Sequence, residues 1–488
     1  MSDTLPDTIE FMTWVGGVTV TVPFLLLGLL GLPSLLGYRL TEATSARATR
    51  WLTFVGLLAA CGLFLSMLVS GHRHVVLDLG NWVEIHAHAG AGHEHYHFSA
   101  KFVFDRLSIP LVILSYLLCG TIGAFAVKYL HREPGYNRFF VLFGVFLCGM
   151  VTASAAGTIE TLFTGWELVG LSSALLVAYF QERPAPARNG LRIWAVYRVS
   201  DAALLTAAVV MHQMAGEGDF DRLLGSGWPG GAAPTTSDQA LLVGLLLLLA
   251  AAGKSALLPF SGWLPRAMEG PTPSSAVFYG ALSVHLGAFL LLRANALIAA
   301  SVWLAVAVVA LGLLTAAFAY LAGSVQTDIK SALSFASLTQ VGLIVIEIGA
   351  GHWVPFLWYV ALAHLIGHAC MRTLQFVRAP SLLQDYRRLE NAIGGRLQHR
   401  TGFWLGLLPV ALRQWVYRFA LERGYLDVAL DRFVVRPFVA VFQWFDDREW
   451  RLTAWLNAAP DPREPGSGAA PCPAPPEPAA AAAARSDV

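Results

Sequence analysis

The sequence has little charge and lacks the short motifs with which soluble enzymes hold cofactors. Of its 488 residues, 13% are charged and 56% are hydrophobic, and the formal net charge is +1. This composition is typical of a protein that crosses a membrane many times, and a chain without a basic surplus gives no support to a nucleic-acid partner. It contains no Gly-rich dinucleotide motif and no P-loop, so we expect it neither to bind NADH nor to hydrolyse ATP.

Cysteine is also scarce, and it is not arranged as a metal or redox motif. The five cysteines form no CxxC pair; they are Cys61, Cys119, Cys148, Cys370 and Cys472. Iron–sulfur, haem and zinc-thiolate signatures are therefore absent from the sequence, and we expect no cofactor in this chain. The N-terminal segment is acidic and lacks the basic region of a signal peptide, so its first apolar segment is expected to be retained.

Long hydrophobic runs are what the sequence has in abundance. Eleven apolar windows are long enough to cross a bilayer: 13–36, 51–70, 107–127, 138–158, 161–180, 192–214, 239–258, 274–293, 297–321, 329–349 and 353–376. A shorter apolar run, 402–413, is a doubtful addition. We therefore predict an all-α polytopic membrane protein with about 11–13 transmembrane helices.

Basic residues gather in alternate loops. They follow the first, third, fifth and last windows, whereas the loop after the sixth window is acidic. Because basic loops stay on the cytoplasmic side, the N-terminus is predicted outside, in the periplasm, and residues 377–400 inside. The sequence divides into N-terminal spans with an outer loop (1–100), a translocation core (101–376), a basic and amphipathic segment that lies on lipid or a partner (377–458) and a Pro/Ala-rich tail expected to be disordered (459–488).

One stretch places a lysine and a helix break at membrane depth. An apolar run leads to Lys254, and the residues that follow it break the helix: Pro259, Pro265, Gly270, Pro271 and Pro273. A charge in hydrocarbon costs several kcal/mol, so such a lysine usually faces protein or water and has a function. Broken backbone is tolerated there only beside a cavity or packed protein. The stretch between about 254 and 272 therefore indicates an ion path.

Other ionisable residues lie inside the predicted spans, and together they make a candidate proton path: Glu167, Arg198, Asp201, Lys254, His285, Lys330, His364 and His368. His364, His368 and Arg372 are spaced four residues apart, so all three share one helix face. Arg198 and Asp201 are one turn apart and can pair. A single buried Glu–Lys pair is often only structural, whereas ionisable groups in five spans favour ion movement.

Half of the histidines lie between the second and third windows: His72, His74, His86, His88, His93, His95 and His97. In an extended chain the last three share a face and could bind zinc or copper. No cysteine or carboxylate set completes such a site, so we predict no metal here and a solvated outer hairpin instead.

These residues resemble a known family. The sequences Trp166–Gly170, Lys254–Ala256, Trp263–Pro265, Gly270–Pro273 and Asp328–Lys330 with Ser337–Gly342 resemble the antiporter-like subunits of NADH:quinone oxidoreductase and of Mrp-type cation antiporters, the NuoL/MrpA-like proteins. The resemblance covers about residues 100–376 and implies an antiporter-like fold. It implies a central Glu167–Lys254 pair and a path continued by Lys330, His364 and His368.

The chain departs from that family at three places. Tyr279 stands where the respiratory subunit usually has histidine, with His285 further on, and Arg372 stands where it has lysine. Arginine keeps its charge, so Arg372 is expected to be an electrostatic anchor. A second broken helix and the long lateral helix have no clear match, although Gly424–Asp427 and Arg436–Pro437 resemble a segment near the respiratory subunit's C-terminus.

This pattern, with Met268–Ser275, Arg372–Gln375 and Arg378–Ser381, is similar to the DabB-type membrane subunits of inorganic-carbon pumps. The resemblance implies a bacterial inner-membrane protein that conducts protons or Na⁺ to energise CO2 or bicarbonate uptake. The zinc and the hydration chemistry would belong to a DabA-type, carbonic-anhydrase-like partner, so this chain is not expected to be an enzyme. The alternatives are a pump subunit of a respiratory or Mrp complex, and an anchor that holds a cytoplasmic enzyme without conducting.

Overall fold

A computed structural model describes residues 5–86, 95–230, 235–393 and 409–456 of the chain. The chain divides into two compact units, Met1–Leu430 and Asp431–Val488. His88 and His93 of the histidine-rich loop, most of the doubtful run 402–413 and the predicted tail lie outside the described residues.

The first unit is a helical bundle with one β-hairpin. Its regular elements are α1 (Leu5–Leu35), α2 (Glu42–Ser70), β1 (His74–His86), β2 (His95–Asp105), α3 (Ser108–Tyr129), α4 (Tyr136–Ala155), α5 (Ile159–Val177), α6 (Pro184–Ala215), α7 (Phe220–Leu223), α8 (Ser237–Lys254), η1 (Phe260–Gly262), α9 (Trp263–Arg266), η2 (Ala267–Glu269), α10 (Thr272–Ser274), η3 (Ser275–Tyr279), η4 (Ser283–His285), α11 (Leu286–Arg293), α12 (Asn295–Ala300), α13 (Val302–Gly323), α14 (Ile329–Ala350), α15 (Phe356–Ile393), α17 (Val410–Leu421), η5 (Arg423–Tyr425) and α18 (Leu426–Leu430).

Among the described residues, nine helical segments are long and apolar enough to cross a membrane. The runs predicted at 161–180 and 353–376 are also helical, as α5 and α15, and both carry ionisable side chains that lower their hydropathy. The predicted helical, polytopic character of the protein is confirmed. The predicted break is confirmed as well, because α8 ends at Lys254 and the next long helical segment begins at Thr272.

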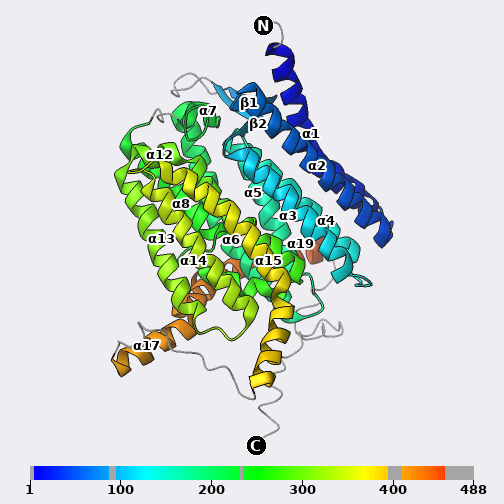
Figure 1. The fold of residues 1–488 in the computed structure, drawn as a ribbon, viewed down its shortest axis with the longest axis vertical. Coiled ribbons are helices and arrows are strands. Elements are labelled where there is room, and N and C mark those ends of the chain that lie inside the picture. Colours follow the sequence, from blue (N-terminus) through cyan, green and yellow to red (C-terminus); the bar gives the residue numbers. More distant parts are fainter. Residues whose placement is uncertain (1–4, 87–94, 231–234, 394–408, 457–488) are drawn as a thin grey trace, which may run out of the picture. The chain divides into compact units, whose positions relative to one another are not determined.

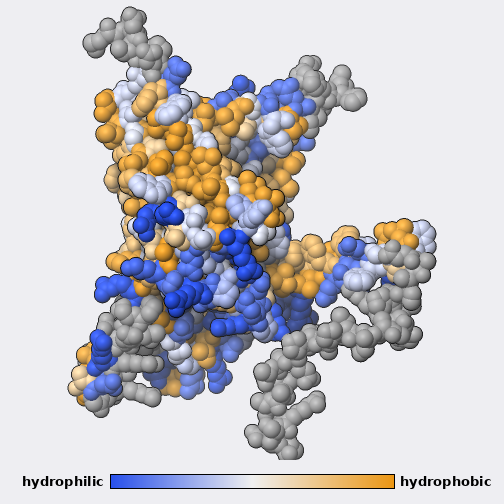
Figure 2. Space-filling view, turned by 90° about the vertical axis from the view of Figure 1, so that its right-hand side faces the viewer, coloured by the Kyte–Doolittle hydropathy of each residue, from blue (hydrophilic) through white to orange (hydrophobic). Residues whose placement is uncertain are grey.

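The helices form two groups joined by a central layer. α1 and α2 pack with α3 and α4, while α13 and α14 pack together, and α5, α6 and α8 connect the two groups (Figure 1). Each group presents leucines and aromatic rings that no neighbouring helix covers, including Leu29, Leu65 and Leu313. On the face drawn in Figure 2, hydrophobic side chains gather in a broad zone above a band of hydrophilic ones. An uncovered apolar zone of this kind suits contact with lipid chains.

The two ends of the bundle differ in charge. At one end, the first turn of α4 contacts the loops after α1 and α5, since Asn137 donates to the Leu40 carbonyl and Arg138 to the Tyr179 carbonyl. This basic end carries the arginines that predict a cytoplasmic orientation. The opposite end, named the hairpin end below, holds β1, β2 and α7 (Figure 1).

The hairpin lies where an outer hairpin is expected between the second and third windows, although the predicted all-α fold class contains no strands. β1 and β2 pair antiparallel, from His74 opposite Asp105 to His86 opposite His95. The hairpin is fastened to the bundle by its backbone, because Gly157 donates to the Lys101 carbonyl and Phe220 donates to the Gly157 carbonyl. The many polar residues in β1 and β2 hide the strand pattern from a search for apolar periodicity.

The second unit contains η6 (Asp431–Val435) and α19 (Arg436–Leu456) in its described part. α19 carries aromatic residues among acidic and basic ones, including Trp444, Asp447 and Trp450, and it has no buried residue. It is the amphipathic helix that the sequence predicts for this region, although what it lies against stays a prediction.

Candidate functional site

Lys254 is fully buried at the end of α8, where the backbone stops being helical. Its ammonium group donates to the Trp166 carbonyl at 3.0 Å and lies 4.3 Å from the centre of the Tyr197 ring. The polar groups freed by the break find partners in the protein, because Trp263 donates to the Gly253 carbonyl and Leu258 donates to the Thr315 hydroxyl. The break is therefore stable at this depth without lipid contact.

The charged residues beside Lys254 form a branched chain of ion pairs, named the central cluster below. Asp201 lies 4.0 Å from the Lys254 ammonium and accepts from the Trp166 indole at 2.6 Å. Arg198 bridges two carboxylates, Asp201 at 2.7 Å and Glu167 at 2.6 Å. The cluster thus holds two carboxylates and two cations, so the four charges balance when all are ionised.

Two expectations about these residues need correction. The predicted direct Glu167–Lys254 pair is wrong: among the described residues, Lys254 is ion-paired with Asp201, and Glu167 is ion-paired with Arg198. The predicted Arg198–Asp201 pair is confirmed, but it lies in the middle of α6 rather than at its start. Pro184 begins α6 eight residues before the predicted window, which shifts the pair further along the helix.

A glycine makes room for the buried amine. If Gly170 carried a Cβ atom, that atom would lie 2.7 Å from the Lys254 ammonium nitrogen. The rings of Trp166 and Tyr197 lie at 4.9 and 4.3 Å on other sides of the amine. The Trp166–Gly170 motif therefore supplies a carbonyl acceptor, an aromatic wall and the space that Lys254 occupies.

A second buried group, named the histidine row below, joins η4 to α15. His285 and His368 approach at 2.8 Å through their ring nitrogens, and Arg372 donates to the other nitrogen of His368 at 3.4 Å. His285 also meets the Ala281 carbonyl, so its Nδ1 carries a hydrogen. The network assigns both imidazoles as neutral, with each donating away from Arg372.

His364 lies on the same face of α15 but has different partners. Its Nδ1 is 2.9 Å from Glu347 and its Nε2 is 3.0 Å from Gln340, both on α14. The sequence analysis missed Glu347, although a glutamate within the apolar run Ile344–Ile348 is a visible signal. The ring centres of His364 and His368 are 6.4 Å apart, so the two groups are neighbours.

Lys330 lies apart from these groups. It is in the first turn of α14, where Asp328 caps the helix by accepting from the Ser331 amide. Lys330 precedes Glu347 by 17 residues, which is about 25 Å along a helix. The predicted passage from Lys330 to His364 therefore needs groups between them that the sequence analysis did not name.

Buried hydroxyl groups lie between the central cluster and the histidine row. The Tyr197 hydroxyl adjoins that of Ser283, which is two residues before His285. The hydroxyls of Tyr197, Ser255 and Ser283 are buried and lack a regular hydrogen bond to protein. Buried polar atoms in this condition are usually satisfied by water. The two groups are therefore joined by a stretch that suits a short water chain.

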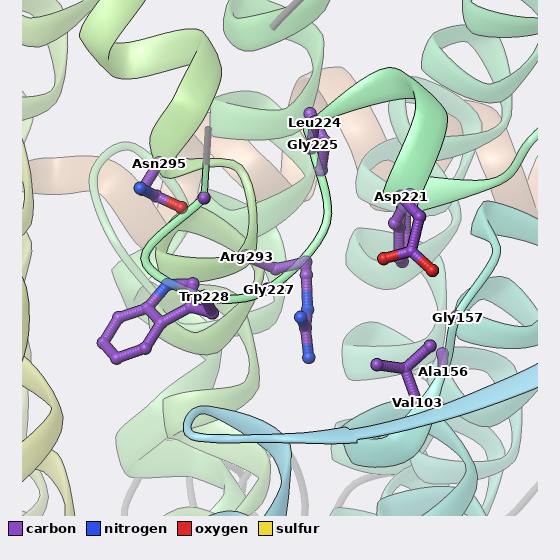
Figure 3. Close-up of a pocket in the computed structure, with 12 residues that line it drawn as sticks. Val103, Ala156, Gly157, Asp221, Leu224, Gly225, Gly227, Trp228, Arg293 and Asn295 are labelled. Carbon is purple, nitrogen blue, oxygen red and sulfur yellow. The ribbon is translucent and has the colours of Figure 1, made fainter. Parts of the chain in front are cut away.

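The hairpin end has a buried ion pair that the sequence analysis also missed. Arg293, at the end of α11, pairs with Asp105 at 2.5 Å, and the same carboxylate caps α3 through the amides of Leu107 and Ser108. Burial opposes ionisation, but Arg293 and these amides hold the pKa of Asp105 below its usual value. Figure 3 shows Arg293 among the residues that line a small pocket, which also include Asp221.

Within the part of the chain that the structure describes, no group of three or more His, Cys, Asp or Glu side chains is placed to hold a metal ion. His97 instead lies beside Asn81 at 3.2 Å and Glu84 at 3.5 Å.

The family of the chain follows from sequence comparison. Residues 138–398 match the family described as NADH:quinone oxidoreductase/Mrp antiporter, TM, and residues 92–140 match the N-terminal region of complex I chain 5. The chain belongs to this antiporter-type family. The matched region contains the central cluster, the break and the histidine row.

Curated relatives include fungal proteins named NADH-ubiquinone oxidoreductase chain 5. The one from Cryptococcus neoformans var. grubii is 29% identical over 346 residues, which are 70% of this chain and 51% of the fungal chain. The one from Schizophyllum commune is 31% identical over 329 residues, 66% of this chain and 45% of the fungal chain. The chain spans about half the length of the curated relatives it matches.

Solved structures share the fold. A chain of the Mrp complex from Dietzia sp. DQ12-45-1b is 24% identical, with a TM-score of 0.58 over 76% of this chain and 37% of that chain. A chain of the membrane-bound sulfane sulfur reductase, an archaeal respiratory complex, is 16% identical, with a TM-score of 0.61 over 86% of this chain and 87% of that chain. These two likenesses concern the fold alone.

Proposed function

We propose that this chain is a cation-conducting subunit of a membrane complex, with the proton as its ion. The observation that carries the proposal is the central cluster, in which a fully buried lysine at a helix break contacts a chain of ionisable groups. Buried charges inside spans are costly and are retained mainly where ions or protons move. Membership of the antiporter-type family supports the same function.

The proposed path runs through residues that the sequence singled out. Lys254 exchanges protons with Asp201. Arg198 pairs with Asp201 and also with Glu167, which links both carboxylates to the exchange. Water beside the Tyr197 hydroxyl then connects Lys254 with His285 and the histidine row. In this path Arg372 is an electrostatic anchor for His368. Lys330, in the first turn of α14, keeps its predicted role as a residue that continues the proton path.

The first experiment measures proton uptake by proteoliposomes that contain the purified chain, driven by a potassium diffusion potential and followed with a pH-sensitive dye. Lys254→Met removes the buried ammonium but keeps the side-chain length, and it is expected to reduce the initial rate at least tenfold. Lys128→Met, which changes an exposed lysine in the last turn of α3, is the matched control and should retain the wild-type rate. Equal rates for both variants and wild type would refute conduction through Lys254.

The ion is identified in the same vesicles. Uptake that persists at an unchanged rate when Na⁺ is replaced by choline supports the proton. Uptake that requires Na⁺ and can be followed with ²²Na⁺ would replace the proton by Na⁺ in the proposal.

A second candidate function is energy coupling for inorganic-carbon uptake with a DabA-type, zinc-containing partner. It is favoured by Arg372 in place of the respiratory lysine and by the motifs Met268–Ser275 and Arg378–Ser381, which resemble the DabB-type subunits. The fungal relatives and the family match favour a respiratory or Mrp-type complex instead. Location in a bacterial inner membrane, with the N-terminus in the periplasm, belongs to the same proposal.

Growth separates the two complexes. A bacterium without carbonic anhydrase should grow in ambient air only when this chain is produced together with its genetic neighbour, and Lys254→Met should abolish that growth. Co-purification with quinone-reductase or antiporter subunits, without rescue of growth, would assign the chain to a respiratory or Mrp-type complex. Rescue that survives Lys254→Met would make the chain a membrane anchor for the partner.

A further inference from the structure

The hairpin end carries a compact set of charged side chains near the surface. Lys101 of β2 donates to both carboxylate oxygens of Asp219, at 2.9 and 2.8 Å, and to Asp221 at 2.6 Å. His74 of β1 lies 3.2 Å from the same Asp221 carboxylate. Burial favours the neutral acid, but His74 and Lys101 lower the pKa of Asp221 to about 2, so this carboxylate stays ionised.

A buried acid–histidine pair lies next to this set. Glu160 of α5 and His212 of α6 approach at 2.7 Å, and both side chains are largely buried. Phe98 of β2 stacks on the His212 ring at 4.8 Å, and the strap between α6 and α7 closes the other side, where a side chain at Gly218 would collide with the Glu160 carboxylate. The hairpin and the strap therefore cover the pair.

The pair keeps hydrogen-bonding capacity beyond its own 2.7 Å contact. The Nδ1 atom of His212 faces the Ala208 carbonyl, which leaves Nε2 toward Glu160. The approach of Nε2 is off the axis of a regular hydrogen bond, and both Glu160 oxygens and Nε2 lack a regular partner. Neighbouring buried groups with unused capacity suit a bound water and an exchangeable proton.

The same two helices carry the central cluster. Glu160 and Glu167 are seven residues apart on α5, so they share a face and are separated by about 10.5 Å. On α6, Asp201 and His212 are eleven residues apart, which is close to three turns and again one face. The seam between α5 and α6 therefore leads from the covered pair to the central cluster.

We propose that the seam between α5 and α6 is the proton inlet from the hairpin end, with Glu160 and His212 as relay residues between the surface and the central cluster. This inference rests on the proposed conduction of protons. The charged or titratable groups around the pair are Lys101 and His97 on β2, Asp219 on the strap and Glu167 on α5. Acidic groups outnumber lysine there, which attracts protons toward the seam.

The test uses the full chain in proteoliposomes and compares two carboxylates of the same end. Glu160→Gln removes the acid but keeps its shape, and it is expected to lower the initial rate of proton uptake at least tenfold. Glu217→Gln is the matched control, because Glu217 pairs with the exposed Arg222 at 2.6 Å and lies outside the proposed seam. Its rate should stay within twofold of the wild type.

A purely structural role is tested by two more readouts. Glu160→Asp retains an acid at the site and should restore part of the rate, with a shifted dependence on the pH at the hairpin end. Thermal unfolding of Glu160→Gln should stay close to the wild type; if that variant does not fold, His212→Gln replaces it in the comparison with Glu217→Gln.

The outcomes separate the inlet from conduction itself. A wild-type chain without uptake refutes the proposed function. A conducting wild type with an equally active Glu160→Gln overturns the inlet and leaves conduction intact. Equal losses in Glu160→Gln and Glu217→Gln also overturn it, because the effect would then come from the fold of the hairpin end.

Discussion

Replacing Gly170 by alanine tests how closely the central cluster is built. In an ordinary helix this change stabilises by about 1 kcal/mol. Here the new Cβ atom would lie 2.7 Å from the Lys254 ammonium nitrogen, so the amine has to move. The Trp166 and Tyr197 rings lie 4.9 and 4.3 Å from the amine and restrict its movement, and the hydrogen bond to the Trp166 carbonyl at 3.0 Å is lost or bent.

The magnitude follows from that hydrogen bond. A bond to a charged group contributes about 1.5–3 kcal/mol, which exceeds the gain in helix propensity. The matched control is Gly62→Ala on α2, where a Cβ atom meets no atom within 4 Å. The free energy of unfolding should therefore be lower for Gly170→Ala than for Gly62→Ala by about 1.5–3 kcal/mol.

Two assays check this prediction. Reversible unfolding in mixed lipid–SDS micelles gives the difference in stability, and proteoliposome uptake gives the rate, which should fall severalfold only in Gly170→Ala. If the two variants match in both assays, Lys254 is not held against Gly170, and the described geometry of the cluster is wrong.

Three further predictions concern ion pairs. The hydrogen bond to Asp221 raises the pKa of His74 above 6.5. The stabilisation of the fold by protonated His74 is therefore complete below pH 6.5 and is lost as the pH rises through the raised pKa. The backbone amides of β1, corrected for their intrinsic rates of hydrogen exchange, should exchange faster at pH 9 than at pH 6. Asp427→Asn breaks the 2.8 Å ion pair with Arg266 and should lower the free energy of unfolding by about 1–2 kcal/mol. The same substitution should lower it by less in a chain that already carries Arg266→Gln. Asp105→Asn keeps the cap of α3 but leaves its arginine partner buried without a counter-charge, so unfolding should show a loss of about 3–5 kcal/mol.

The sequence predicted the parts of this fold that depend on composition along the chain. Apolar runs gave the helices, and proline and glycine after Lys254 gave the break, because both signals are local. The ionisable residues in the spans were visible for the same reason. The outer hairpin was expected, but the extent of β1 and β2 was not, since these strands gain stability from each other and from contacts such as Lys101 with Asp221 of α7, and not from an apolar pattern of their own.

The contacts between the candidate site residues were harder to predict from the sequence than the identity of those residues. The partner of Lys254 is Asp201 because of how α6 is rotated and where it starts, and Pro184 sets that start eight residues before the apolar window. Trp166 and Tyr197 do not ionise, so a search for charges passes over them although they surround the amine. Arg293 is the last residue of the predicted window 274–293, and its pairing with Asp105, 188 residues away, leaves no local signal in the sequence.

The charge balance of the two buried groups indicates how uptake and release are linked. The central cluster is neutral when its two carboxylates and two cations are ionised, whereas the histidine row already contains Arg372 without a carboxylate partner among its hydrogen bonds. A proton on His368 would therefore place two cations side by side, which costs about 4 kcal/mol at 4 Å and an effective dielectric of 20. That cost falls if Arg372 turns away toward Gln375, to which it already donates at 2.6 Å.

The transfer of a proton out of the central cluster also leaves one uncompensated negative charge behind. That charge favours the arrival of the next proton at the cluster, while the positive charge on the histidine row favours release from it. In the proposed path, uptake and release are thus coupled by electroneutrality, without a direct contact between Lys254 and Glu167. A lysine at position 372 could give up its charge at this step, whereas arginine keeps it, so in the proposed path a movement of Arg372 takes the place of its deprotonation.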